Sequence, residues 1–319
     1  MRKFLILLAA LFVGFASAQD DYEIVLIPGL TTDAFYITMD RGGAAAAEAL
    51  GVDYQFQGAE EFNPTLQVPV LEAVIARQPD AIVIAPTDTT QLIEPLRRAA
   101  EAGITVVTVD TFIDDGQYQD GVGDGDFPIS YIASDNMMGG RMAARAMADA
   151  VGGEGSVYVA NVRPGISTTD QREAGFIAEM EENYPNITVL NTQYNENDSS
   201  TAASQFQAVL ARDPDLAGVF GANLFSALGA ANGVDGAGMS DEVTVVAFDA
   251  PESIVGNLES GLVDLVIAQH PAEIGFYGVV TAYAALSGQS VPPQIGTGFT
   301  VMSADNINDP EIQKFIYSD

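Results

Sequence analysis

The sequence predicts an α/β protein made of two doubly wound parallel-sheet lobes, and three observations lead to this prediction. At roughly 150 residues per domain, the chain of 319 residues is long enough for two packed cores. A composition of 48% apolar and 18% charged residues excludes a disordered chain and a coiled coil. Short apolar runs alternate with longer stretches of helical periodicity, which is the pattern of βαβ units.

The expected strands of the first half are short runs rich in Val and Ile. Residues 81–85 and 105–109 contain no charged residue, as is typical of parallel strands buried on both faces. Between the strands lie Ala-rich or amphipathic segments that are long enough for helices. Strands are expected at residues 23–28, 52–56, 81–86, 105–110 and 129–134, and helices at 35–50, 65–77 and 91–102.

The same alternation begins again after Ser134, so a second set of elements is expected there. No Pro/Ser-rich linker or block of charge marks the boundary near Ala133 and Ser134. This suggests two lobes that share crossing strands rather than two domains joined by a tether. Strands are expected at 156–161, 187–192, 217–223, 243–249 and 262–269, and helices at 137–151, 170–184, 199–213, 225–233, 250–260 and 274–287.

The first 18 residues have the pattern of a cleaved signal peptide. Arg2 and Lys3 precede an apolar run over residues 4–15, and the sequence Ala-Ser-Ala over 16–18 suits signal peptidase. The apolar run is shorter than the roughly 20 residues that span a bilayer. We expect export, cleavage after residue 18 and a periplasmic protein without a lipid anchor, because the chain has no cysteine to carry one.

The charge balance is strongly acidic, with 12 basic and 44 acidic residues and a net charge of −32. Binding to nucleic acid is therefore disfavoured, since a phosphate backbone needs clustered cations. The acids are spread along the chain, which favours a role in solubility or in salty surroundings over a cationic substrate. The Gly- and Asp-rich loop 114–126 lacks the spacing of a calcium-binding loop, so we interpret it as a solvated loop and predict no metal site.

Polar residues follow several of the expected strands at their carboxyl ends. Asp110, Asn223, Asp249 and Gln269 each end such a run, and Asp33 lies in the loop after the first strand. In open α/β sheets ligands bind at this edge, so these side chains are candidate ligands of a bound solute. The alternative is that Asp and Asn only cap the helices that follow.

The set is rich in hydrogen-bond acceptors and has aromatic neighbours. Carboxylates accept strong hydrogen bonds from hydroxyl groups. Phe35, Tyr36 and Phe112, adjacent to Asp33 and Asp110, could offer a flat apolar surface to the C–H face of a sugar. The pattern favours a neutral, polyhydroxylated ligand.

Enzymatic functions find less support. His270 is the only histidine, and we expect it to be structural, at the hinge or the mouth of the cleft. Nucleophile-elbow, Walker-type and zinc-protease motifs do not occur. Asp110 and Asp249 remain possible as a glycosidase pair by spacing alone, but the candidate residues are distributed around a ligand rather than focused on one bond. We predict no catalytic residue and no cofactor.

Seven motifs lie in order along nearly the whole chain: DAFYITMDRG, IVIAPTDTTQLIEPLRRAAEAGITVVTVDT, YIASDNMMGGRMAA, TTDQREAGF, VFGANLFSALGA, VVAFDAPESI and VIAQHPAEIG. They resemble motifs of the ribose- and glucose/galactose-binding proteins of bacterial ABC importers. The resemblance implies the type I periplasmic binding protein fold, with a hinge of three crossing strands. By it, one lobe comprises 20–133 plus 270–297 and the other 134–269 plus 298–319.

The resemblance also assigns roles to individual positions. It implies that Asn197 lines the pocket. It also implies ligand-binding roles for the strand-end and aromatic candidates Asp33, Phe35, Tyr36, Asp110, Asn223, Asp249 and Gln269. Three positions depart from the ribose-binding pattern: Ala85 stands for Asn, and Thr111 and Asp170 stand for two arginines. The loss of two guanidinium groups argues against ribose itself. Arg172 could supply the missing cation, but a salt bridge on the helix surface is the interpretation we favour.

We therefore predict a monomeric periplasmic binding protein that captures a neutral monosaccharide or polyol by lobe closure and delivers it to the membrane subunits of an ABC permease. A furanosyl signalling molecule or a nucleoside is the alternative ligand, and a secreted glycosidase the alternative outside this class. The candidate ligand-binding residues are Asp33, Phe35, Tyr36, Asp110, Thr111, Phe112, Asp170, Arg172, Asn197, Asn223, Asp249 and Gln269.

Overall fold

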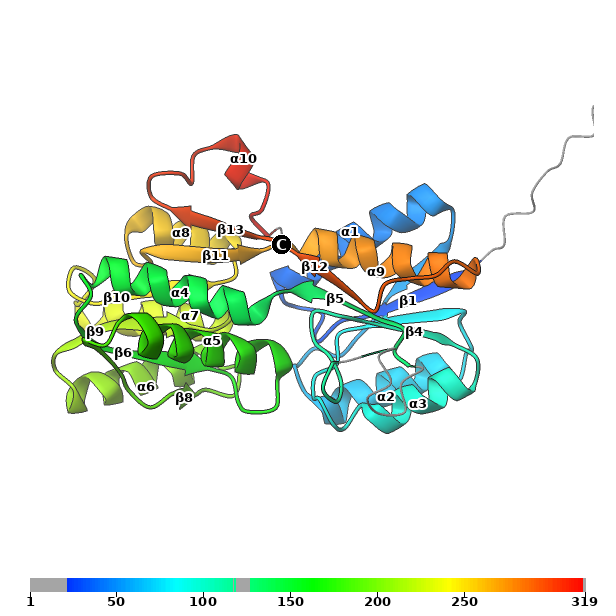
Figure 1. Cartoon of the computed structure of the whole chain (residues 1–319), viewed down its shortest axis with the longest axis horizontal. Coiled ribbons are helices and arrows are strands. Elements are labelled where there is room, and N and C mark those ends of the chain that lie inside the picture. The colour runs from blue at the N-terminus through cyan, green and yellow to red at the C-terminus, as the bar shows by residue number, and fades with distance from the viewer. Residues whose placement is uncertain (1–21, 117, 119–126, 318–319) are drawn as a thin grey trace, which may run out of the picture.

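The computed structural model describes residues 22–116, 118 and 127–317, so the expected signal peptide and most of the loop 114–126 lie outside the described residues. The chain forms two α/β lobes side by side (Figure 1). This confirms the predicted fold class. Within the described residues, no helix is both long and apolar enough to cross a membrane.

The first lobe is built on a sheet with the strand order β12-β5-β4-β3-β1-β2. All of its strand pairs are parallel. Helices α1 and α9 cover one face and α2 and α3 the other (Figure 1). The elements are β1 (Glu23–Ile27), α1 (Ala34–Leu50), β2 (Asp53–Phe56), α2 (Pro64–Ile75), β3 (Ala81–Ile84), α3 (Ile93–Glu101), β4 (Thr105–Val109), β5 (Ser130–Ser134), α9 (Pro271–Leu286) and β12 (Gln294–Thr297).

The second lobe is built on a sheet with the order β13-β11-β10-β9-β6-β7, with β8 also paired to β6. Helices α4 and α5 pack on one face, and α6, α7 and α8 lie on the other side. The elements are α4 (Asn136–Ala150), β6 (Gly155–Asn161), α5 (Ser167–Asn183), β7 (Ile187–Val189), β8 (Gln193–Tyr194), α6 (Ser199–Arg212), β9 (Leu216–Gly221), α7 (Leu224–Ala237), β10 (Thr244–Phe248), α8 (Glu252–Ser260), β11 (Leu265–Gln269), β13 (Phe299–Ser303) and α10 (Pro310–Gln313).

Several details differ from the elements expected from the sequence. Helix α5 begins at Ser167, three residues earlier than expected, helix α7 continues to Ala237, four residues further than expected, and α10 was not expected. Strands β12 and β13 were not expected as elements, and β13 pairs with β11 in the antiparallel direction. Strand β11 begins at Leu265, three residues later than the expected run. Just before it, the carboxylate of Asp264 accepts a hydrogen bond from the backbone N–H of Val245. The short strand β8 also lies outside the expected set.

The described chain passes between the two lobes three times. It crosses after β5, after β11 and between β12 and β13. The hydroxyl oxygens of Ser134 and Thr297, on two of these crossings, lie 3.2 Å apart. The C-terminal segment after α10 also returns to the junction of the lobes (Figure 1). The junction therefore holds several segments that are far apart in the sequence.

In each lobe, two helices cross closely with a glycine on both of them. Gly42 and Gly275 let α1 approach α9, and Gly140 and Gly175 let α4 approach α5. A Cβ atom on any of the four would overlap a backbone carbonyl oxygen of the opposite helix. For Gly140, in the second lobe, the carbonyl oxygen that a Cβ atom would overlap belongs to Arg172. The close approach of α4 thus determines where Arg172 lies.

Replacing Gly140 by Ala should lower the free energy of unfolding by about 1 to 3 kcal/mol, because α5 must move away from the added methyl group. Urea denaturation measures this change. Gly236→Ala is the matched control: Gly236 lies exposed in α7, and nothing would contact its Cβ within 4 Å. We expect the control to be neutral or stabilising by up to about 1 kcal/mol. Equal stability of the two variants would contradict the packing argument.

Candidate ligand-binding site

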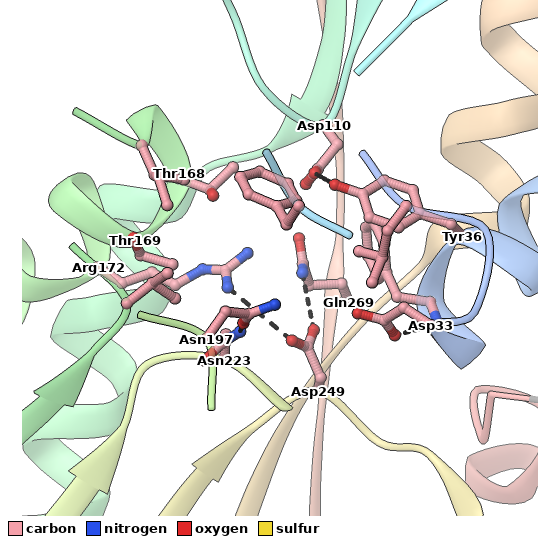
Figure 2. A pocket seen from close by; sticks show the side chains of 15 residues that line it. Asp33, Tyr36, Asp110, Thr168, Thr169, Arg172, Asn197, Asn223, Asp249 and Gln269 are labelled. Carbon is pink, nitrogen blue, oxygen red and sulfur yellow. Dashed lines mark hydrogen bonds and ion pairs between the residues drawn. The ribbon is translucent and has the colours of Figure 1, made fainter. Parts of the chain in front are cut away.

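A cavity of about 430 Å³ lies between the lobes, at the carboxyl ends of their strands. Side chains from both lobes point toward one another across it (Figure 2). The edge that the sequence indicated is therefore where the structure forms a pocket.

Nine of the twelve candidate residues line this cavity. Three of them belong to the first turn of α1 or to its cap. Three follow strands β4, β9 and β10, and one is the last residue of β11. The other two belong to α5 and to the loop before α6. Asp33 and Asn223 also cap α1 and α7, so capping and cavity lining coexist in the same residues. The nine are Asp33, Phe35, Tyr36, Asp110, Arg172, Asn197, Asn223, Asp249 and Gln269.

Thr111, Phe112 and Asp170 do not line the cavity. Thr111 is buried beside it. The Phe112 ring packs edge-on against Tyr131 and lines a separate depression near β5 and β12, so it cannot serve as the expected stacking surface there. Asp170 lies two residues before Arg172 on α5 and hence on another helix face, where its carboxylate accepts a hydrogen bond from the Gly165 N–H.

Six further residues line the cavity without having been predicted. Four are apolar residues of loops, which carry no periodic or polar signal. The other two, Thr168 and Thr169, lie four and three residues before Arg172 and so share its helix face. That spacing could have identified them once Arg172 was placed in the cavity. The six are Leu30, Phe62, Val162, Ile166, Thr168 and Thr169.

Arg172 is buried, with 2% of its surface exposed, so the favoured interpretation of a salt bridge on the helix surface is wrong. Its Nε donates to Asn136 Oδ1 and its Nη1 to the carbonyl oxygen of Ala222, both at 2.8 Å. The guanidinium carbon lies 3.9 Å from the centroid of the Phe248 ring. These contacts hold the cation against the wall of the cavity with its free edge directed inward (Figure 2).

Asp249 is the most connected carboxylate of the site. Its Oδ1 accepts hydrogen bonds from Gln269 Nε2 at 2.9 Å and from the Tyr317 hydroxyl at 3.2 Å. Its Oδ2 accepts from the Leu224 N–H at 3.2 Å and lies 4.0 Å from Arg172 Nη1. A buried carboxylate needs such partners, since an unpaired buried charge costs several kcal/mol.

Asp33 and Asp110 lie on the side of the first lobe. The Tyr36 hydroxyl donates to Asp110 Oδ2 at 2.8 Å. Burial, with smaller contributions from the charges of Asp249 and Asp110, raises the pKa of Asp33 to about 7. Burial also raises the pKa of Asp110 to about 6, although Arg172 and the Tyr36 hydrogen bond act in the opposite direction. Hydroxyl groups of a ligand would stabilise both ionised carboxylates.

Three polar residues of the cavity have left-handed backbone conformations. Asp110, Asn197 and Asp249 have φ angles of 60°, 63° and 75°. Non-glycine residues adopt this conformation infrequently, and such residues cluster at functional sites because the surrounding structure must maintain them. Asp and Asn tolerate it best. Asp110 and Asp249 adopt it directly after strands β4 and β10, Asn197 adopts it in the loop before α6, and all three line the cavity.

Two buried polar atoms of the cavity lack a hydrogen-bond partner among the described residues. They are Thr169 Oγ1 and Gln269 Oε1, in side chains that are 3% and 1% exposed. Leaving a buried polar atom unpaired costs about 1 to 3 kcal/mol. A polar ligand in the cavity would satisfy both atoms.

His270 lies at the hinge, as expected. It caps α9 with its backbone, its Nε2 is 3.0 Å from Thr300 Oγ1, and its ring stacks on Phe315 at 4.0 Å. These contacts give it a structural position outside the cavity. Within the described ranges, no group of three or more His, Cys, Asp or Glu residues could hold a metal ion.

Comparison with known proteins agrees with this architecture. A family profile described as "Periplasmic binding protein domain" matches residues 24–290. The chain belongs to this family. Membership assigns it to the periplasm and, with the relatives below, to the ABC-type binding proteins rather than to enzymes, so the glycosidase alternative finds no support.

Solved structures and curated proteins show similarity over most of the chain. A solute-binding protein of an ABC transporter from Agrobacterium vitis, solved with bound α-D-tagatopyranose, is 66% identical, with a TM-score of 0.92 and coverage of 93% of this chain and 100% of that one. A carbohydrate-binding protein from Agrobacterium radiobacter, in complex with D-arabinose, is 28% identical, with a TM-score of 0.86 and coverage of 93% and 99%. The ribose import binding protein of Haemophilus influenzae is 29% identical over 95% of this chain and 100% of its own length.

The raised pKa of Asp33 predicts a specific dependence of stability on pH. The folded protein binds the proton of Asp33 up to about pH 7, whereas the unfolded chain releases it near the ordinary value of 3.8. The contribution of Asp33 to the free energy of unfolding is therefore fully present below pH 3.8 and is lost as the pH rises through about 7. Asp33→Asn keeps the helix cap but removes the titration. Between about pH 5 and pH 8, the wild type should lose on the order of 1 to 3 kcal/mol relative to this variant in urea denaturation. Parallel pH profiles would contradict the assignment.

Proposed function

We propose that this chain is a periplasmic binding protein that captures a neutral monosaccharide, or a related polyol, and delivers it to the membrane permease of an ABC importer. The observation that carries the proposal is the cavity itself. Its walls come from both lobes and carry buried carboxylates, amides and one guanidinium group. Two of its polar atoms lack hydrogen-bond partners among the described residues. Such a set matches a ligand that donates and accepts many hydrogen bonds at once.

The charges of the cavity support a neutral ligand. Asp33, Asp110 and Asp249 face a single cation, Arg172, so an anionic sugar would meet more repulsion than attraction. The rings of Phe35 and Phe62 supply apolar surface for the C–H face of a sugar ring. The relatives with bound α-D-tagatopyranose and D-arabinose carry ligands of this class.

We infer that the ligand is enclosed by movement of the two lobes, 20–133 plus 270–297 and 134–269 plus 298–319. Two hydrogen bonds join the lobes beside the cavity. The Arg163 Nη2 donates to the carbonyl oxygen of Thr87 at 3.2 Å, and the Phe112 N–H donates to Ser167 Oγ at 3.1 Å. A ligand that contacts both lobes would favour the closed form over an open one.

The remaining features of the proposal follow from the sequence. The signal peptide would be removed after residue 18, and the mature protein would act as a monomer without a cofactor. The closed form would present a surface from both lobes to the membrane subunits of the permease. The strong negative charge of the chain keeps such a protein soluble.

A calorimetric binding panel with the mature protein tests this function. We expect a neutral sugar such as D-tagatose to bind with micromolar affinity, equivalent to roughly −8 kcal/mol, and D-ribose to bind more weakly. D-galacturonate, an anionic sugar, should bind at least about tenfold more weakly than the best neutral sugar. Preference for a nucleoside or for the anionic sugar would contradict the proposed ligand class.

Variants of the cavity carboxylates locate the binding site in the same assay. Asp110→Ala and Asp249→Ala should each weaken sugar binding at least about tenfold, because each removes charged hydrogen bonds worth about 1.5 to 3 kcal/mol. Asp149→Ala, on the exposed side of α4, is the matched control and should bind as the wild type does. Wild-type affinity in both cavity variants would place the site elsewhere.

A further inference from the structure

Tyr317, near the C-terminus, lies behind the cavity without lining it. It is 1% exposed. Its backbone N–H donates to the carbonyl oxygen of Ala250 at 2.8 Å, and it forms a parallel bridge with Pro251. The segment after α10 thus returns to the loop that follows Asp249, at the junction of the two lobes (Figure 1).

The hydroxyl group of Tyr317 contacts two residues of the cavity. It donates to Asp249 Oδ1 at 3.2 Å and accepts from the backbone N–H of Gln269 at 2.9 Å. Burial raises the pKa of Tyr317 well above its ordinary value, so the hydroxyl keeps its proton and can donate at any physiological pH. One group therefore ties the carboxylate after β10 to the end of β11.

The ring of Tyr317 reaches the opposite lobe. Its centroid lies 5.8 Å from that of Phe35, at an interplanar angle of 66°, and Phe35 lines the cavity from α1. Edge-to-face pairs of this kind are favourable. Tyr317 consequently contacts residues of the cavity from both lobes.

Packing alone does not explain a tyrosine at this position. A phenylalanine would fill the same space without burying a hydroxyl group, which is costly unless its hydrogen bonds are made. Here both bonds are made to cavity residues, and Asp249 has the left-handed φ of 75° that needs support from its surroundings. Gln269 Nε2 donates to the same Oδ1 atom as the Tyr317 hydroxyl, so the two donors fix the direction of the carboxylate.

We propose that Tyr317 is a positioning residue of the ligand-binding site, whose hydroxyl holds Asp249 and the end of β11 in the arrangement that meets the ligand. This inference rests on the proposed function. It adds to the site a residue that comes from the C-terminal segment rather than from a strand end.

Tyr317→Phe tests the role, with D-tagatose as the probe, or any sugar of the panel that binds more tightly. The variant keeps the ring and removes the hydroxyl, and its affinity should fall about five- to twentyfold. Tyr54→Phe is the matched control, because the Tyr54 hydroxyl also donates to a carboxylate, Asp40 Oδ1 at 2.8 Å, and neither residue lines the cavity. The control should bind within about twofold of the wild type. Thermal unfolding of both variants shows whether they are folded.

A double-mutant cycle with Asp249→Ala separates positioning from general stability, because alanine leaves the Tyr317 hydroxyl no side-chain acceptor at this position. If Tyr317 acts through Asp249, Tyr317→Phe should weaken binding little or not at all when residue 249 is already Ala. Independent losses that multiply in the double variant would overturn the inference, and so would wild-type affinity in Tyr317→Phe. Failure of the wild type to bind any sugar of the panel would instead refute the proposed function.

Discussion

The site depends on the burial of carboxylates around one guanidinium at the place where the two sheets meet. Arg172 lies 4.0 Å from Asp249, and each is held by further hydrogen bonds from the second lobe. The cation cannot neutralise Asp33 and Asp110 as well, and burial raises the pKa of both carboxyl groups. The cavity is therefore rich in acceptors that gain stabilisation from any ligand with several hydroxyl groups.

The two lobes reach this arrangement by the same means. In each sheet one strand is followed directly by an aspartate with a positive φ angle: β4 by Asp110 and β10 by Asp249. Each lobe also brings two helices together at glycine, α1 with α9 and α4 with α5. The cavity lies between these matching halves, and the crossings after β5 and β11 and between β12 and β13 connect them. Relative movement of the halves would open and close the cavity without disturbing either sheet.

The sequence predicted the sheets and the polar residues after their strands that line the cavity, because both are local properties. A short, continuous apolar run identifies a buried parallel strand. The next polar residue, such as Asp110 or Gln269, then lies at the carboxyl-end edge of the sheet, where ligands bind in folds of this kind. Side chains whose position depends on packing between elements were not predictable in this way. Arg172 is buried because α5 lies against α4, and Tyr317 reaches the cavity only through the return of the C-terminal segment. Phe112 turns toward Tyr131 instead of the cavity, which its proximity to Asp110 in sequence did not indicate.

Hydrogen–deuterium exchange with and without saturating sugar tests most directly whether a ligand joins the two lobes. The account predicts slower exchange in segments of both, around Asp33 and Asp110 in the first lobe and around Arg172 and Asp249 in the second, with little change in the strands distant from the cavity. Slower exchange confined to one lobe, or located away from the cavity, would contradict it.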